Sequence, residues 1–147
     1  MLLSLPFSAA ASAAGTSPSN QISDQSMTAA SEGTFDIYCD GQNMLMWCDW
    51  WSVFDDDLIY RIDVTIDFEK SVSWLGWQTK TTKNQTLYLN SPYNEAYGQL
   101  EADLTPYGSG TYRGRAMATA YTFDGDALIM PIKLSSSVSA PFPATFN

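Results

Sequence analysis

Apolar and polar residues alternate most strictly over residues 58–69. One set of alternate positions is apolar: Leu58, Tyr60, Ile62, Val64, Ile66 and Phe68. The intervening set is mostly polar: Ile59, Arg61, Asp63, Thr65, Asp67 and Glu69. Because successive side chains of a strand point to opposite faces of a sheet, this pattern predicts a half-buried β-strand. A helix would scatter the same apolar residues around its circumference.

Other short runs predict further strands. Phe35, Ile37 and Cys39 alternate with polar residues, and an almost wholly apolar run predicts a central strand over residues 44–53. Four more strands and a hairpin partner are expected at residues 72–80, 86–89, 99–104, 111–123 and 127–134. An Asp-Gly pair at residues 124–125 predicts the turn between the last two. Since no segment has a helical period, we expect an all-β sandwich of two antiparallel sheets.

Residues 104–115 read Leu-Thr-Pro-Tyr-Gly-Ser-Gly-Thr-Tyr-Arg-Gly-Arg. This segment resembles the corner before the penultimate strand of immunoglobulin-like β-sandwich domains. In that corner a tyrosine, here Tyr112, follows a turn and its hydroxyl bonds to upstream backbone. The resemblance implies an immunoglobulin-like antiparallel β-sandwich of seven to eight strands, and no particular function. Gly114 departs from antibody domains, so their usual inter-sheet disulfide cannot form.

The first residues predict an exported chain. Residues 1–13 form an apolar stretch followed by small residues, with an Ala-x-Ala pattern at Ala11 and Ala13, as in the later part of a secretory signal peptide. No positively charged start precedes it, which indicates a truncated gene model; the alternative is an accidental match. Residues 14–33 are expected to be a flexible leader, 34–140 the β-sandwich domain and 141–147 a C-terminal tail.

Two cysteines, Cys39 and Cys48, lie close together in the sequence. In an exported chain such a pair predicts a disulfide, and the alternative is two free buried thiols. A tight turn at residues 40–41 would leave Cys48 too far along its strand to be bridged. The disulfide therefore requires a loop centred near residues 43–44.

Charge and composition exclude some classes of function and disfavour others. The chain has 16 acidic and 7 basic residues, a net charge of −9 and no histidine. The acidity disfavours nucleic acid and anionic membrane surfaces as partners. Without histidine, serine or cysteine nucleophiles activated by a histidine base are excluded. Low charge content, with many Ser, Thr and Asn residues, is typical of a secreted, extracellular protein, and no stretch is long enough for a transmembrane segment.

Five tryptophans are the most distinctive feature of the composition. Trp50 and Trp51 are neighbours on a predicted strand and must face opposite sides of the sheet. The candidate ligand-binding residues are Trp47, Trp51, Trp74 and Trp77. Exposed, they would stack on sugar rings or anchor a protein partner; alternatively they pack beneath loops or cover sheet edges.

Two groups of carboxylates are weaker candidates. Calcium prefers several oxygen ligands, so a metal site is conceivable at Asp55, Asp56 and Asp57; an ordinary solvated turn is the alternative. A glycosidase-like carboxylate pair is conceivable among Asp63, Asp67 and Glu69, although any polar strand face has this spacing. No catalytic residues are assigned, and calcium is the one cofactor considered.

The sequence therefore predicts a secreted or cell-surface, non-enzymatic binding or interaction module of unknown ligand. One alternative is a carbohydrate-binding module that uses exposed tryptophans. Another is a structural subunit of an extracellular assembly, which would use the leader and an open sheet edge for strand addition. The partner is expected to be a protein or a carbohydrate.

Overall fold

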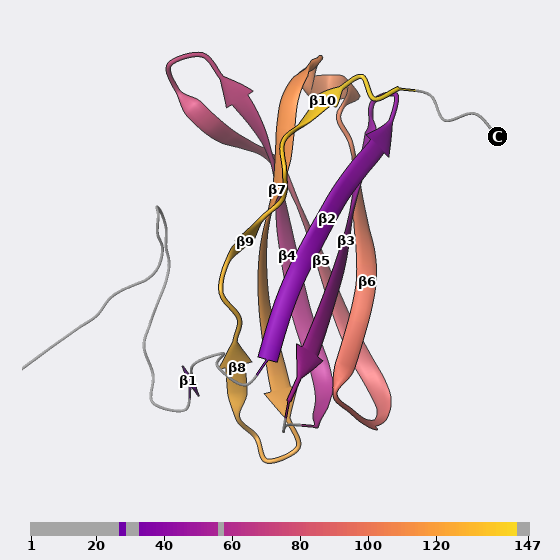
Figure 1. Ribbon diagram of the computed structural model, residues 1–147, viewed down its shortest axis with the longest axis vertical. Helices are drawn as coiled ribbons and strands as arrows, with labels where there is room; N and C mark the ends of the chain where they lie inside the picture. Colours follow the sequence, from indigo (N-terminus) through magenta and orange to yellow (C-terminus); the bar gives the residue numbers. More distant parts are fainter. Residues whose placement is uncertain (1–26, 29–32, 56–57, 144–147) are drawn as a thin grey trace, which may run out of the picture.

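A computed structural model describes residues 27–28, 33–55 and 58–143, which form two β-sheets facing each other (Figure 1). The expected signal peptide, most of the expected leader, Asp56, Asp57 and residues 144–147 lie outside the described residues. Within the described ranges, no helix is long and apolar enough to cross a membrane. The all-β prediction with two sheets is confirmed.

The smaller sheet consists of β2 (Gly33–Gln42), β3 (Leu45–Phe54) and β6 (Glu95–Asp103), in the order β2-β3-β6 with antiparallel pairing throughout. The apolar β3 lies in the centre, as predicted. Its even-numbered residues from Met46 to Phe54 are buried, whereas its odd-numbered residues point outward. Trp50 is 1% exposed and Trp51 is 42% exposed, so the two do face opposite sides.

The larger sheet has the order β1-β8-β7-β4-β5, with two further short strands paired to β7. Its long strands are β4 (Ile59–Val72), β5 (Gly76–Tyr93) and β7 (Gly110–Thr122). The short ones are β1 (Met27–Thr28), β8 (Ala127–Ile129), β9 (Lys133–Leu134) and β10 (Val138–Ala140). All pairs are antiparallel except β1 with β8, and β1 comes from the segment expected to be a leader. The predicted hairpin turn at residues 124–125 connects β7 to β8.

The alternation that predicted β4 holds in its centre and fails at its start. Ile62, Val64, Ile66 and Phe68 are all buried, as expected. A register irregularity between Ile59 and Arg61 reverses the alternation, so Ile59 is buried while Leu58 is 52% exposed. A β-bulge inserts one extra residue and so turns the preceding side chains to the other face.

Two predicted strands are wrong in extent. The segment 72–80 is not one strand, because β4 ends at Val72, the chain turns through residues 73–75 and β5 begins at Gly76. β5 then continues through the strand predicted at 86–89. The segment 127–134 is divided into β8 and β9, separated by residues 130–132.

The core lies between the inner faces of the two sheets. Its largest fully buried side chains are Trp50, Tyr112, Phe35, Phe54, Phe68 and Met46. The Nε1–H group of Trp50 donates a hydrogen bond to Oε1 of Gln85 on β5, at 2.9 Å. A Cβ on Gly98 would lie 2.8 Å from the Trp50 ring, so this glycine leaves the space that the indole occupies. Apolar contact and this hydrogen bond therefore join the two sheets, and backbone hydrogen bonds between Asn43 and Phe142 link the β2–β3 turn to the segment after β10.

Tyr112 at the start of β7 forms the predicted corner. Its side chain is fully buried, and its hydroxyl donates a 2.6 Å hydrogen bond to the carbonyl of Gly108. Gly108 follows the short 3-10 helix η3 (Thr105–Tyr107) and has a φ of 81°. Burial, with the neighbouring Tyr107, raises the pKa of Tyr112 and so keeps the hydroxyl protonated as a donor.

We expect Tyr112→Phe to lower the free energy of unfolding by about 1–2 kcal/mol, because the Gly108 carbonyl loses its donor while the ring stays in place. Urea denaturation measures the change. Tyr38→Phe is the matched control, since Tyr38 is 58% exposed and its hydroxyl faces water. Equal stability of Tyr112→Phe and the wild type would contradict a structural role for the corner.

Candidate functional site

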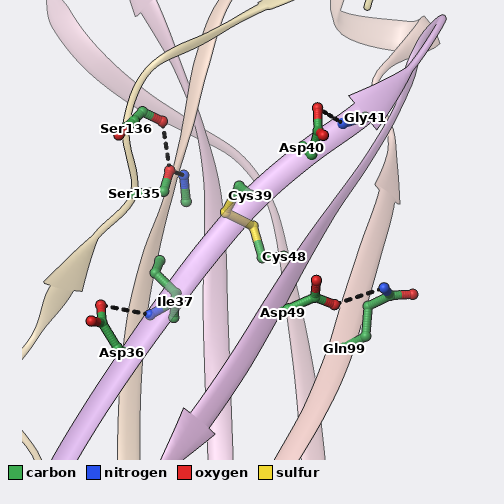
Figure 2. Close-up of a disulfide and its surroundings, with 11 residues drawn as sticks. Asp36, Ile37, Cys39, Asp40, Gly41, Cys48, Asp49, Gln99, Ser135 and Ser136 are labelled. Atoms are coloured by element: carbon green, nitrogen blue, oxygen red, sulfur yellow. Dashed lines mark hydrogen bonds between the residues drawn. A yellow bond between two sulfur atoms is a disulfide. The ribbon is translucent and has the colours of Figure 1, made fainter. Parts of the chain in front are cut away.

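Cys39 and Cys48 form the predicted disulfide (Figure 2). They lie directly opposite each other in the β2–β3 ladder, with Cα atoms 4.0 Å apart. Asn43, with a φ of 58°, is at the turn between the two strands. The loop is thus centred at residues 43–44, as the disulfide requires, and the alternative tight turn at residues 40–41 does not occur. Both sulfur atoms point inward against Gly114 of β7.

The four candidate tryptophans do not form one site. Trp47 and Trp51 lie on the outer face of β3, where Trp47 is half-buried and Trp51 is 42% exposed. Trp74 and Trp77 lie on the hairpin between β4 and β5, where Trp74 is 96% exposed. This hairpin extends away from the two sheets at the upper left of Figure 1.

Trp47 and Trp51 are part of a larger set on the outer face of the smaller sheet. In the ladder, Trp51 lies between Asp36 of β2 and Tyr97 of β6. Two residues along, Asp49 lies between Tyr38 and Gln99, and Trp47 follows between Asp40 and Glu101. We call this surface the aromatic–acidic face. Its aromatic residues are Tyr38, Trp47, Trp51 and Tyr97, and its acidic residues are Asp36, Asp40, Asp49, Glu95, Glu101 and Asp103.

Charge is unevenly distributed between the two sheets. The strands β2, β3 and β6 contain no lysine or arginine. All seven basic residues of the chain lie on the larger sheet: Arg61, Lys70, Lys80, Lys83, Arg113, Arg115 and Lys133. The six carboxylates of the aromatic–acidic face are thus uncompensated on that face, and their negative potential is directed at whatever approaches the rings.

Local hydrogen bonds position several carboxylates of this face. Oδ1 of Asp36 accepts from the Ile37 N–H at 2.9 Å, and Oδ1 of Asp40 accepts from the Gly41 N–H at 2.8 Å. Asp49 accepts a 2.8 Å bond from the side-chain amide of Gln99 on the neighbouring strand (Figure 2).

Asp103 is held at the edge of the same face. Its carboxylate accepts from the hydroxyl and the backbone N–H of Thr105, at 2.6 and 3.0 Å. These two bonds lower the pKa of Asp103 below the ordinary range of an aspartate. This corner of the aromatic–acidic face therefore keeps its negative charge in mildly acidic solution.

The outer face of the larger sheet also carries aromatic residues, and arginines of the same sheet lie against three of them. The guanidinium of Arg61 lies 4.7 Å from the centre of the Tyr121 ring and 5.8 Å from that of Tyr88. Arg113 lies 4.2 Å from the Trp77 ring. Guanidinium groups are attracted to the negative faces of aromatic rings, so each of these rings already has a cationic partner within the molecule, although Tyr88 is still 64% exposed.

The three carboxylates considered for catalysis are likewise paired. Ion pairs join Asp63 to Arg61 at 2.7 Å, Glu69 to Arg113 at 2.7 Å and Asp67 to Arg115 at 3.3 Å. Burial raises the pKa of Asp63, but hydrogen bonds from Arg61 and Thr86 outweigh it and leave the pKa lowered. A lowered pKa suits a structural carboxylate and not a general acid.

Of the three residues considered for calcium, the structure describes only Asp55, which is exposed after the end of β3. Within the described part of the chain, no three acidic or cysteine side chains lie together as a metal site.

Sequence reasoning missed two members of the aromatic–acidic face. Tyr97 precedes the strand predicted at residues 99–104, because β6 actually begins at Glu95. Tyr38 belongs to a predicted strand, on the side opposite Phe35 and Ile37, and this position was a usable signal. Tyr38 and Tyr97 are more exposed than Trp51, at 58% and 76%.

No protein-family model matches this chain, and no curated protein is significantly similar to it in sequence. The function has to be inferred from these two surfaces, the aromatic–acidic face and the hairpin between β4 and β5.

Proposed function

We propose that this protein is a non-enzymatic binding module and that the aromatic–acidic face is its binding surface. The observation that carries this proposal is the contrast between the two sheets. On the larger sheet, Arg61 lies against Tyr121 and Tyr88 and Arg113 lies against Trp77, whereas the smaller sheet provides no cation for its rings. Rings that remain exposed in this way favour contact with a second molecule.

The charge of the face restricts the ligand. Six carboxylates and no cation repel an anion, so the proposed ligand is neutral or cationic. A cationic group resting on Trp51 or Tyr97 would gain from the ring and from the neighbouring carboxylates Asp36 and Glu95. A lysine- or arginine-bearing protein segment satisfies both requirements.

A carbohydrate is the alternative ligand. Trp47 and Trp51 lie four residues apart on one strand, about 13 Å at strand spacing, so a chain of sugar rings could contact both. The Asp49–Gln99 pair lies between them and offers hydrogen-bonding groups in a fixed position. Rings flanked by such polar groups are suited to the apolar faces and hydroxyl edges of sugars.

Strand addition at an open sheet edge is less favoured. β5 is the edge of the larger sheet, but it carries Lys80 and Lys83 and has a register irregularity opposite Phe68 and Glu69. Charged side chains and bulges on an edge strand hinder pairing with another chain. This argues against strand addition at β5.

Export and an immunoglobulin-like relationship remain part of the proposal. The Cys39–Cys48 disulfide supports an oxidising, extracellular environment. The hydrogen bond from Tyr112 to Gly108 supports an immunoglobulin-like version of the sandwich. The ion pairs of Asp63, Asp67 and Glu69 support a non-enzymatic role.

A small set of probes tests the proposal through intrinsic tryptophan fluorescence, because Trp51 reports directly on the face. The probes are hexalysine, a neutral cellulose hexamer, a cationic glucosamine hexamer and an anionic galacturonate hexamer. We expect a fluorescence change with hexalysine or with the neutral or cationic sugar, and none with galacturonate.

The pattern of responses separates the candidates. A response to hexalysine alone favours the protein ligand, and a response to a sugar alone favours the carbohydrate-binding module. Added salt should weaken hexalysine binding, since the interaction is electrostatic. No response to any probe at millimolar concentration, or a preference for galacturonate, would contradict the proposal.

A further inference from the structure

We propose that the tip of the β4–β5 hairpin, formed by Trp74 and Leu75, inserts into the headgroup region of a lipid surface. This inference concerns a second surface and does not depend on the aromatic–acidic face. Trp74 is 96% exposed and Leu75 is 63% exposed, so most of the surface of both residues is open to solvent. Two adjacent large apolar side chains with this exposure are unusual in a folded domain.

The hairpin projects beyond its neighbours. The pairing of β4 with β7 ends at Lys70 opposite Tyr112. From there to the turn, β4 pairs only with β5, through Ser71 with Trp77 and Val72 with Gly76. The tip therefore lies clear of both sheets, as Figure 1 shows, and can reach a flat surface ahead of the rest of the protein.

The projecting part of the hairpin has no carboxylate that would oppose its approach to a lipid surface, although the whole chain is acidic. Residues 70–80 contain Lys70 and Lys80 and no carboxylate. At the base of the hairpin, the Glu69 carboxylate is already paired with Arg113 at 2.7 Å. At physiological ionic strength, charges are screened over about 8 Å, so the acidic face of the other sheet contributes little at the tip. Lys70 and Lys80 lie at the base of the hairpin, where Lys70 donates a 2.6 Å hydrogen bond to the Tyr107 carbonyl, so contact with lipid depends on the two apolar side chains and not on charge.

The small area of the tip favours lipid over a protein pocket. Trp74 and Leu75 together offer about 200–350 Å², whereas a stable protein interface buries about 800 Å² on each partner. A lipid surface needs no matching pocket, and tryptophan has both an apolar ring and an N–H group suited to the membrane interface. The nearby side chains of Ser71, Ser73 and Gln78 are uncharged and polar.

The backbone at Trp74 indicates that a tryptophan is not kept there for stability. Its φ is 57°, in the left-handed region that disfavours large side chains. Asparagine adopts this region more readily, so Trp74→Asn removes the ring without disturbing the turn. This variant therefore separates a binding role from a folding role.

Vesicle flotation tests the inference, with vesicles of phosphatidylcholine alone and with 30% phosphatidylserine. Because two inserted side chains give weak, reversible binding, total lipid must be in the millimolar range. We expect the wild type to float with both kinds of vesicle, because insertion of the apolar tip does not require an anionic headgroup. We expect Trp74→Asn to lower the partition coefficient by about tenfold or more while melting no lower than the wild type. Leu134→Asn, which removes an apolar residue that is 52% exposed on β9, should float like the wild type.

Three results would overturn this inference. The first is no flotation of the wild type with either vesicle. The second is flotation that Trp74→Asn leaves unchanged, since the tip would then not be the anchor. The third is a protein partner that binds the wild type but not Trp74→Asn, in a case where the wild type does not bind the vesicles. None of these results depends on whether the aromatic–acidic face binds a ligand.

Discussion

Unfolding of the double variant Cys39→Ala/Cys48→Ala is expected to require about 3 kcal/mol less free energy than unfolding of the disulfide-bonded protein. The bridge joins residues nine apart in sequence and closes the loop of the β2–β3 hairpin. Without it, the unfolded chain gains the freedom that the loop had lost. Both side chains are also buried, at 4% and 0% exposure, so their removal leaves a small cavity. Urea denaturation without reductant measures the difference.

Gly114 provides the control for this prediction. A Cβ at this position would lie 2.8 Å from both disulfide sulfur atoms, so Gly114→Ala should destabilise the wild type by about 1–3 kcal/mol. In the double cysteine variant, the same substitution should cost much less, because the sulfur atoms are gone. Equal costs in both backgrounds would show that the sulfurs do not pack against β7 as described.

Trp50→Ala is expected to lower the free energy of unfolding by about 3–5 kcal/mol, the largest effect of any single substitution proposed. The indole is 1% exposed and lies between the sheets beside Gly98, so its removal leaves a large cavity in the core. Its loss also leaves Oε1 of Gln85 without its donor. Thermal and urea denaturation of the purified variant measure the change.

Trp50→Phe separates the two contributions. It keeps an aromatic ring in the core and removes the N–H donor, so we expect a loss of about 1–3 kcal/mol, clearly smaller than for alanine. Trp51→Ala, on the other face of the same strand, should change stability by less than about 1 kcal/mol. A larger effect of Trp51→Ala than of Trp50→Ala would mean that the faces of β3 are reversed.

Much of the fold was predictable because burial on one face leaves a period of two in the sequence. Ile62, Val64, Ile66 and Phe68 carry that pattern, and they are buried as predicted. The disulfide and the corner at Tyr112 were predictable for another reason, since each needs specific residues at short separations. The disulfide and the corner each depend on residues that are close together in the sequence, so a short segment is enough to predict them.

Two of the errors occurred where backbone irregularity changes the pattern. The bulge near Tyr60 exchanges the faces of Leu58 and Ile59, and no residue type marks it. The turn after Val72 has Trp74 in a left-handed conformation, a place where glycine or asparagine is normally expected. A tryptophan at this turn position has the sequence character of a strand residue, which is why the segment 72–80 was predicted as one strand.

The candidate site was only partly predictable. The alternation of side chains correctly separated Trp50 from Trp51, but it could not show that Trp47 and Trp74 belong to different surfaces. That separation depends on which strands pair. The same pairing places every lysine and arginine on the larger sheet. The two sheets therefore differ strongly in charge, which the net charge of −9 alone does not reveal.

Binding through the aromatic–acidic face is tested most directly with the double variant Trp51→Ala/Tyr97→Ala. The variant is titrated, in a calorimeter, with the probe to which the wild type responds. These two side chains are cross-strand neighbours and both are exposed. We predict at least about a tenfold weaker affinity, as expected for aromatic residues at the centre of a binding surface. The matched variant Trp77→Ala/Tyr88→Ala, on the larger sheet, should bind like the wild type. Unchanged affinity of Trp51→Ala/Tyr97→Ala, with a loss in the matched variant, would contradict binding through this face.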